Sequence, residues 1–84
     1  MDTVSMYRDG LRDMTLEVSD VRLYGDMVYF DHWLIAKGYP TWDTIRHDLI
    51  ANDHTEEEAF DVYEALYDEF AEWAEEHDLE PQSC

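Results

Sequence analysis

Several residue types that particular functions require are scarce in this sequence. The one cysteine, Cys84, has no partner for a disulfide within the chain, and a prenylation box needs a cysteine four positions from the end. The three glycines form no phosphate-cradling loop, and neither Ser5 nor Ser19 lies in a GxSxG motif. General acid–base catalysis needs a carboxylate desolvated in a pocket, and an 84-residue chain has little room for one. We therefore expect no enzyme.

Long hydrophobic runs are also missing. No stretch approaches the roughly 18 consecutive apolar residues of a membrane span. The first 20 residues carry five acids, which excludes the apolar region of a signal peptide there. We expect no membrane contact and a cytoplasmic location.

Basic residues are few and unevenly distributed. Five Lys and Arg stand against 22 Asp and Glu, which gives a net charge of −17, beyond the magnitude of roughly 2 to 8 that suits a small soluble domain. Residues 1–46 hold eight acids and five bases, a net of −3, whereas residues 47–84 hold fourteen acids and no Lys or Arg, a net of −14. Direct binding to nucleic acid or to an anionic membrane is disfavoured, and a Lys/Arg-rich partner protein is favoured.

The residues that are abundant predict a folded chain. Hydrophobic residues make up 45% of the sequence and aromatic residues 14%, which is too much for a disordered acidic tail. The length suits one domain with a single core. We expect residues 1–79 to form one small acidic domain and residues 80–84 to be a flexible C-terminal tail.

The clearest predicted helix begins at Thr55, a good N-cap residue, with Glu58 three positions on to complete a capping box. Its acidic last turn conflicts with the negative end of the helix dipole. Apolar side chains recur along it at the spacing of a buried stripe. They are Ala59, Phe60, Tyr63, Leu66, Tyr67, Phe70, Trp73 and Ala74.

Two shorter helices are predicted before it. Residues 42–51 follow Pro40 and Thr41 and end at Asn52, a residue that tolerates the left-handed conformation. Residues 27–37 would be capped by Asp26 and ended by Gly38. We expect one face of this helix to be buried. That face holds Phe30, Trp33, Leu34 and Lys37.

The first 24 residues fit two patterns. Six apolar residues, from Val4 to Val21, recur at helical spacing, but Met14, Leu16 and Val18 alternate as in a strand. A β-hairpin could turn at residues 19–20 or 25–26. We favour the helix, and the predicted fold is mainly α, a small bundle of three to four helices, with a short N-terminal β-hairpin as the alternative.

Six acids on the last predicted helix lie 4, 3, 4, 4 and 3 residues apart and so share one side of it. We call this set the acidic stripe. It comprises Glu57, Asp61, Glu64, Asp68, Glu72 and Glu75. Each like-charge i,i+4 pair costs about 0.2 to 0.5 kcal/mol in an isolated helix, so nothing in folding requires the stripe.

The charge density of this helix indicates a possible use. Residues 55–80 hold twelve acids, or one per roughly 3.3 Å of helix axis, against about 3.4 Å for one strand of B-form DNA. We therefore expect a non-catalytic inhibitor that mimics nucleic-acid backbone charge and blocks a cationic nucleic-acid-binding protein. Small phage-encoded inhibitors of restriction or CRISPR nucleases resemble this chain in composition. Flanking charge is expected from Glu58, Glu69, Glu76 and Asp78.

Other interpretations of the same residues stay open. The stripe could be a solvated face of an acidic protein, or the acidity could be salt adaptation, although the near-neutral first half argues against the latter. The chain could also be an antitoxin-like or regulatory subunit that binds a basic partner through aromatic side chains. The four histidines have no zinc-site spacing, so we expect no metal and no cofactor. Oligomeric state is left undetermined.

Overall fold

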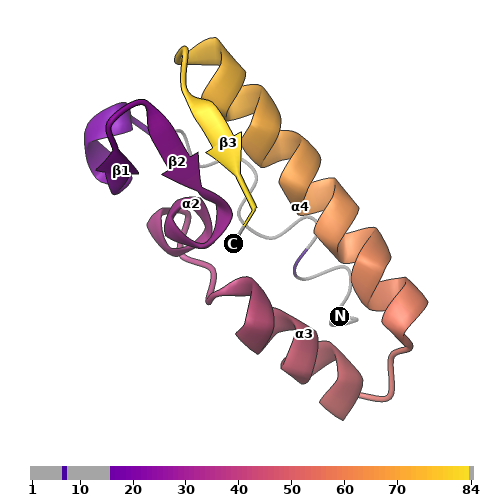
Figure 1. Cartoon of the computed structure of the whole chain (residues 1–84). Coiled ribbons are helices and arrows are strands. Elements are labelled where there is room, and N and C mark those ends of the chain that lie inside the picture. Colours follow the sequence, from indigo (N-terminus) through magenta and orange to yellow (C-terminus); the bar gives the residue numbers. More distant parts are fainter. Residues whose placement is uncertain (1–6, 8–15, 84) are drawn as a thin grey trace.

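The computed structural model describes residue 7 and residues 16–83 of the chain. The described residues form three α-helices, three short strands and one 3-10 turn (Figure 1). In chain order these are η1 (Val18–Asp20), β1 (Leu23–Tyr24), β2 (Met27–Tyr29), α2 (Phe30–Ala36), α3 (Trp42–Ala51), α4 (Glu56–Glu76) and β3 (Glu80–Gln82).

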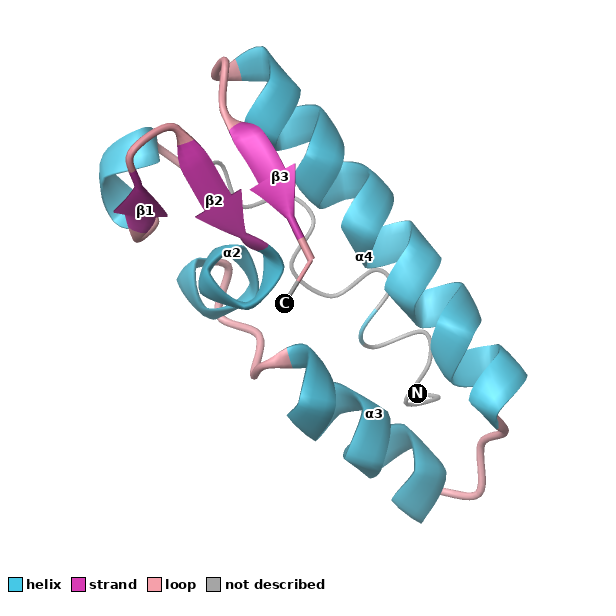
Figure 2. Ribbon diagram, viewed as in Figure 1, coloured by secondary structure: helices cyan, strands magenta, loops and turns pink. Residues whose placement is uncertain are grey.

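The predicted helical bundle is wrong, because the described residues form a small mixed α/β domain. The strands make one three-stranded sheet in the order β1-β2-β3, with β2 antiparallel to β1 and parallel to β3 (Figure 2). Strands of two or three residues are too short to show an alternating pattern. The pairing of β2 with β3 also joins segments about fifty residues apart, which no local pattern predicts.

Residues 23–29 form the β-hairpin that was the alternative prediction. β1 and β2 are joined by residues 25–26, and Gly25 has a φ of 65°, which glycine adopts without steric cost. The favoured helix does not extend through the described residues 16–24. Val18 lies in the 3-10 turn, and Val21 is buried after it. The rest of that prediction, residues 1–6 and 8–15, lies outside the described residues.

The helix predicted for residues 27–37 is shorter than expected. Residues 27–29 form β2, and α2 begins only at Phe30. Val28 is fully buried between the two neighbouring strands, so its burial favours the sheet. The predicted end is confirmed: Gly38 has a φ of 90°, and the Tyr39 amide donates to the Leu34 carbonyl at 2.9 Å.

The bounds predicted for α3 are confirmed, since the helix runs from Trp42 to Ala51. The proposed reason for its end is wrong, however. Asn52 is the C-cap with a φ of −99°, and the left-handed residue is the next one, Asp53, with a φ of 65°. Asp and Asn both tolerate that conformation, so the sequence does not say which residue adopts it.

The start of α4 is also as predicted. The Glu58 amide donates to Thr55 Oγ1 at 3.2 Å, and the Thr55 amide donates to Glu58 Oε1 at 3.2 Å, which completes the capping box. The expected loose tail is wrong for residues 80–82, because they form β3 at the edge of the sheet. Pro81 is compatible with an edge strand, where its missing N–H leaves no ladder bond unmade.

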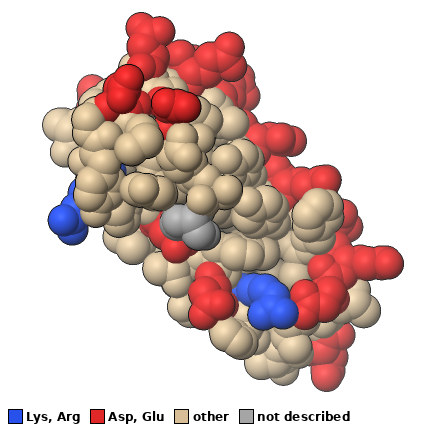
Figure 3. All heavy atoms as spheres, in the orientation of Figure 1, with Lys and Arg blue, Asp and Glu red and all other residues tan. Residues whose placement is uncertain are grey.

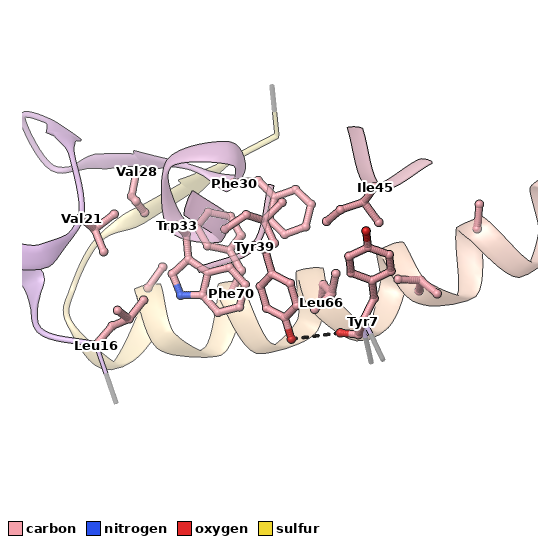
Figure 4. Packing of buried hydrophobic residues seen from close by; sticks show 14 of the residues in the cluster. Tyr7, Leu16, Val21, Val28, Phe30, Trp33, Tyr39, Ile45, Leu66 and Phe70 are labelled. Carbon is pink, nitrogen blue, oxygen red and sulfur yellow. Dashed lines mark hydrogen bonds between the residues drawn. The ribbon is translucent and has the colours of Figure 1, made fainter. Parts of the chain in front are cut away.

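The hydrophobic core fills the space between α2, α3, α4 and the sheet (Figure 4). Phe30, Trp33 and Phe70 pack together there, with ring centroids 5.4 to 6.2 Å apart. The buried face predicted for α2 is confirmed, Lys37 included. The Tyr39 hydroxyl donates to the Tyr7 carbonyl at 3.0 Å, which ties Tyr7 to this core.

Candidate functional site

All six residues of the acidic stripe lie within α4 and are exposed. None of them forms a salt bridge or a side-chain hydrogen bond within the described part of the chain. The stripe lies opposite the side of α4 that is buried in the core. In the space-filling view, acidic side chains follow the edge over α4, while uncharged side chains cover most of the broad face (Figure 3).

Two of the four predicted flanking residues have structural partners instead. Glu69 lies 3.1 Å from Lys37 Nζ, and Glu58 Oε2 lies 3.0 Å from His54 Nδ1 while it also completes the capping box. The hydrogen bond with His54, followed by that from the Thr55 backbone, lowers the pKa of Glu58. Glu76 and Asp78 are exposed at the C-terminal end of α4. Of the ten acids predicted to bind a partner, the stripe and these two residues are therefore the ones exposed on the surface.

The density of open charge is lower than the sequence indicates. Ten acids lie on the 21 residues of α4, but Glu56, Glu58 and Glu69 are each held by a neighbouring side chain. The seven that remain are spaced roughly 4.5 Å apart along the axis, against about 3.4 Å for one strand of DNA. The open carboxylates of α4 resemble a phosphate chain in the sign of their charge and in their linear arrangement. Their charge density along the axis is about three-quarters of that of one DNA strand.

The apolar side of α4 differs from its prediction at two positions. Val62 is fully buried, although the predicted stripe omitted it, whereas Phe60 is 56% exposed. Phe60 lies between the core-facing side and the acidic stripe, three residues after Glu57 and four before Glu64. An exposed aromatic ring thus borders the carboxylates. Helical spacing alone could not separate this position from the buried ones.

Phe60 forms one wall of a hollow of about 410 Å³ between α3 and the N-terminal half of α4. We call this hollow the aromatic groove, and most of its surface is apolar. It is lined by Trp42, Arg46, Glu56, Ala59, Phe60 and Tyr63. Sequence reasoning missed it, because its walls come from two helices whose packing no pattern specifies.

A second hollow, of about 360 Å³, lies beside α2. Its lining includes Arg22, Asp20 and His32. His32 stacks on Tyr24 at 5.6 Å, and its buried Nδ1 has no hydrogen-bond partner among the described residues. This hollow holds neither a nucleophile beside a base nor a set of metal ligands.

The remaining titratable groups form no metal site in the described ranges, which contain no cluster of three or more His, Cys, Asp or Glu side chains. His47 Nδ1 lies 3.5 Å from Asp43 Oδ2 on the exposed side of α3, and two ligands are not a site.

The Tyr7 hydroxyl donates to Asp48 Oδ2 at 2.8 Å. Burial, and then this hydrogen bond and the Asp48 charge, raise the pKa of Tyr7 to about 12.

Comparisons with protein-family models, with curated proteins and with solved structures find no match. None of the helices in the described part of the chain has the length and apolar character that a membrane crossing needs.

Proposed function

We propose that this protein is a non-catalytic inhibitor that occupies the cationic groove of a nucleic-acid-binding protein, such as a restriction or CRISPR nuclease, in the cytoplasm. The supporting observation is the acidic stripe: six exposed carboxylates that have no side-chain partner among the residues the structure describes, on a helix whose opposite side is buried in the core. Such a surface competes with phosphates for the same Lys and Arg side chains. By mass action, the occupied protein is kept from its nucleic acid.

Binding of this kind has two measurable properties. Contacts between exposed charges weaken as salt screens them, and a true competitor is displaced by the ligand that it imitates. Both properties can be tested before the partner has been identified.

The experiment compares two variants that lose the same charge. The stripe variant carries Glu57→Gln, Asp61→Asn, Glu64→Gln and Asp68→Asn. The control variant carries Asp26→Asn, Asp43→Asn, Asp53→Asn and Glu80→Gln, all at exposed positions outside the stripe. Both keep the buried core intact, so circular dichroism should show folded helices in both.

Each protein is immobilised and exposed at low salt to extract of the native host, and bound proteins are eluted by added DNA or RNA and, separately, by a salt gradient. The wild type and the control variant should retain the same nucleic-acid-binding protein, which DNA or RNA then releases. The stripe variant should retain at least tenfold less. Equal retention by the stripe variant, or failure of both nucleic acids to displace the partner, would exclude the proposal.

The exposed Phe60 favours a second candidate, a regulatory subunit that holds a basic partner mainly by aromatic contact. In that case Phe60→Ala would abolish retention in the same assay. Stripe neutralisation would then reduce retention only slightly.

A further inference from the structure

The aromatic groove is built to hold an apolar side chain. Tyr63 lines the groove and makes an edge contact with Trp42, with ring centroids 5.0 Å apart, and a near-parallel stack with Phe60 at 6.2 Å and 15°. Ala59 adds a small side chain to the lining beside these rings. One face of Phe60 packs on Tyr63, and the ring remains more than half exposed.

The two charged residues that line the groove, Arg46 and Glu56, form an ion pair with each other. Arg46 Nη2 lies 2.7 Å from Glu56 Oε1, and Arg46 Nε donates to Glu56 Oε2 at 3.3 Å. The two-point contact uses the Glu56 carboxylate and the fork of the guanidinium. The groove therefore offers a visitor little free charge of its own, and its specificity is for apolar surface.

Three exposed carboxylates beside the groove have no side-chain partner among the described residues. Glu57 and Glu64 of the acidic stripe lie one helical turn before and after Phe60, and Asp61 follows it directly. With a net charge of −17, the protein repels anionic ligands from this region. A visitor that fits both features has an apolar side chain with cationic side chains beside it.

We propose that the aromatic groove is the anchor site for a short amphipathic basic segment of the partner protein, with one large apolar side chain in the groove and flanking Lys or Arg side chains on the acidic stripe. This inference rests on the proposed function, because it takes the partner to be cationic. The groove supplies affinity by burying apolar surface, while the stripe sets orientation and association rate.

The test uses two synthetic peptides of equal length and charge. One is an amphipathic lysine–leucine peptide, and the other has every leucine replaced by serine. Calorimetry should show that the wild type binds the leucine peptide at least tenfold more tightly, a ratio typical of a buried anchor. In NMR titrations the Trp42 indole signal should move with the leucine peptide and stay in place with the serine peptide.

Two variants locate the effect. Phe60→Gln should reduce the ratio of the two affinities to about threefold or less, because it removes one wall of the groove. Ile35→Gln changes a residue of nearly equal exposure, 55% against 56% for Phe60, which lines the second hollow and lies outside the aromatic groove, and it should leave the ratio unchanged. Both residues are more than half exposed, so circular dichroism should be unaltered.

Different results would contradict the anchor site and the role of the acidic stripe. The proposed anchor site is contradicted if the wild type binds both peptides equally. It is also contradicted if the Trp42 indole signal does not move when the leucine peptide is added. The stripe variant should bind both peptides more weakly by the same factor, so that the ratio of the two affinities is preserved. If it binds them as well as the wild type does, recognition by stripe charge fails, and the groove is judged on the Phe60 and Trp42 results alone.

Discussion

Lys37, one of the five basic residues, forms a partly buried ion pair. The residue is 4% exposed, and its Nζ lies 3.1 Å from Glu69 Oε1 and 5.5 Å from the centroid of the Trp33 ring. A buried ammonium requires a compensating charge. Glu69 therefore belongs to the folded core more than to the acidic surface, although both lie on the same helix.

We expect Glu69→Gln to destabilise the fold by about 2 kcal/mol, because the buried Lys37 ammonium would lose its 3.1 Å contact with the Glu69 carboxylate. Glu72→Gln is the matched control, since Glu72 is an exposed member of the acidic stripe and loses the same charge. Its free energy of unfolding should stay level or rise slightly. Urea denaturation measures both, and equal losses would contradict this role of the ion pair.

Tyr7 gives a pH-dependent prediction. Burial and the Asp48 hydrogen bond raise its pKa from 10.0 to about 12, so folding favours the protonated phenol. The resulting stability is fully present below about pH 10 and is lost as the pH rises towards 12.

We expect the free energy of unfolding to fall between those pH values in the wild type and to fall less in Tyr7→Phe, as measured by denaturation in a series of alkaline buffers. Parallel curves for the two proteins would show that another group is responsible.

At the scale of elements, the sequence predicts best where one local rule dominates. The 3,4 spacing and the Thr55–Glu58 box predict α4, and Gly38 predicts the end of α2, because side-chain periodicity and capping act over a few residues. Val28 shows the opposite case. Its helical neighbours suggested a longer α2, but its pairing with β1 and β3 depends on chain segments that come together only in the folded molecule.

The candidate site also has one part that the sequence predicts and one part that it does not. The acidic stripe could be predicted, since it repeats along one helix. The pairing of Glu69 and Glu56, which lowers the density of open charge on α4, could not be predicted, because their partners Lys37 and Arg46 come from the C-cap of α2 and from α3. The exposure of Phe60 also depends on how far α3 covers α4, which is a tertiary property.

The helix dipole gives a prediction for α4 itself. Glu57 lies in its first turn and Glu76 in its last, so Glu57→Lys should cost about 0.5 kcal/mol and Glu76→Lys should gain a similar amount. The two variants change the net charge equally, and their difference isolates the position on the helix. Thermal denaturation at low salt measures both. Equal shifts of the same sign would mean that overall charge outweighs the dipole.

At the scale of the whole molecule, salt should affect folding and binding in opposite directions. Self-repulsion at a net charge of −17 destabilises the compact state, and screening relieves it. We expect the free energy of unfolding to rise with NaCl and to level off by about 0.5 M, where the Debye length is only a few ångströms. Partner binding should weaken over the same range.

The salt-adaptation alternative predicts a different curve. Stability would then continue to rise towards molar salt, and the isolated domain would unfold at low salt. Circular dichroism across the salt series distinguishes the two curves.

The parallel strand β3 has a consequence for recognition. After α4 the chain turns back at once: the Leu79 amide donates to the Ala74 carbonyl at 2.8 Å, and the Glu80 amide donates to the Asp26 carbonyl at 2.7 Å. The helix is therefore fastened at its far end as well as at its cap, and it cannot swing independently of the domain. The carboxylates of α4 are therefore already in their bound arrangement before a partner arrives. Most of the conformational entropy lost on association would be lost by the partner.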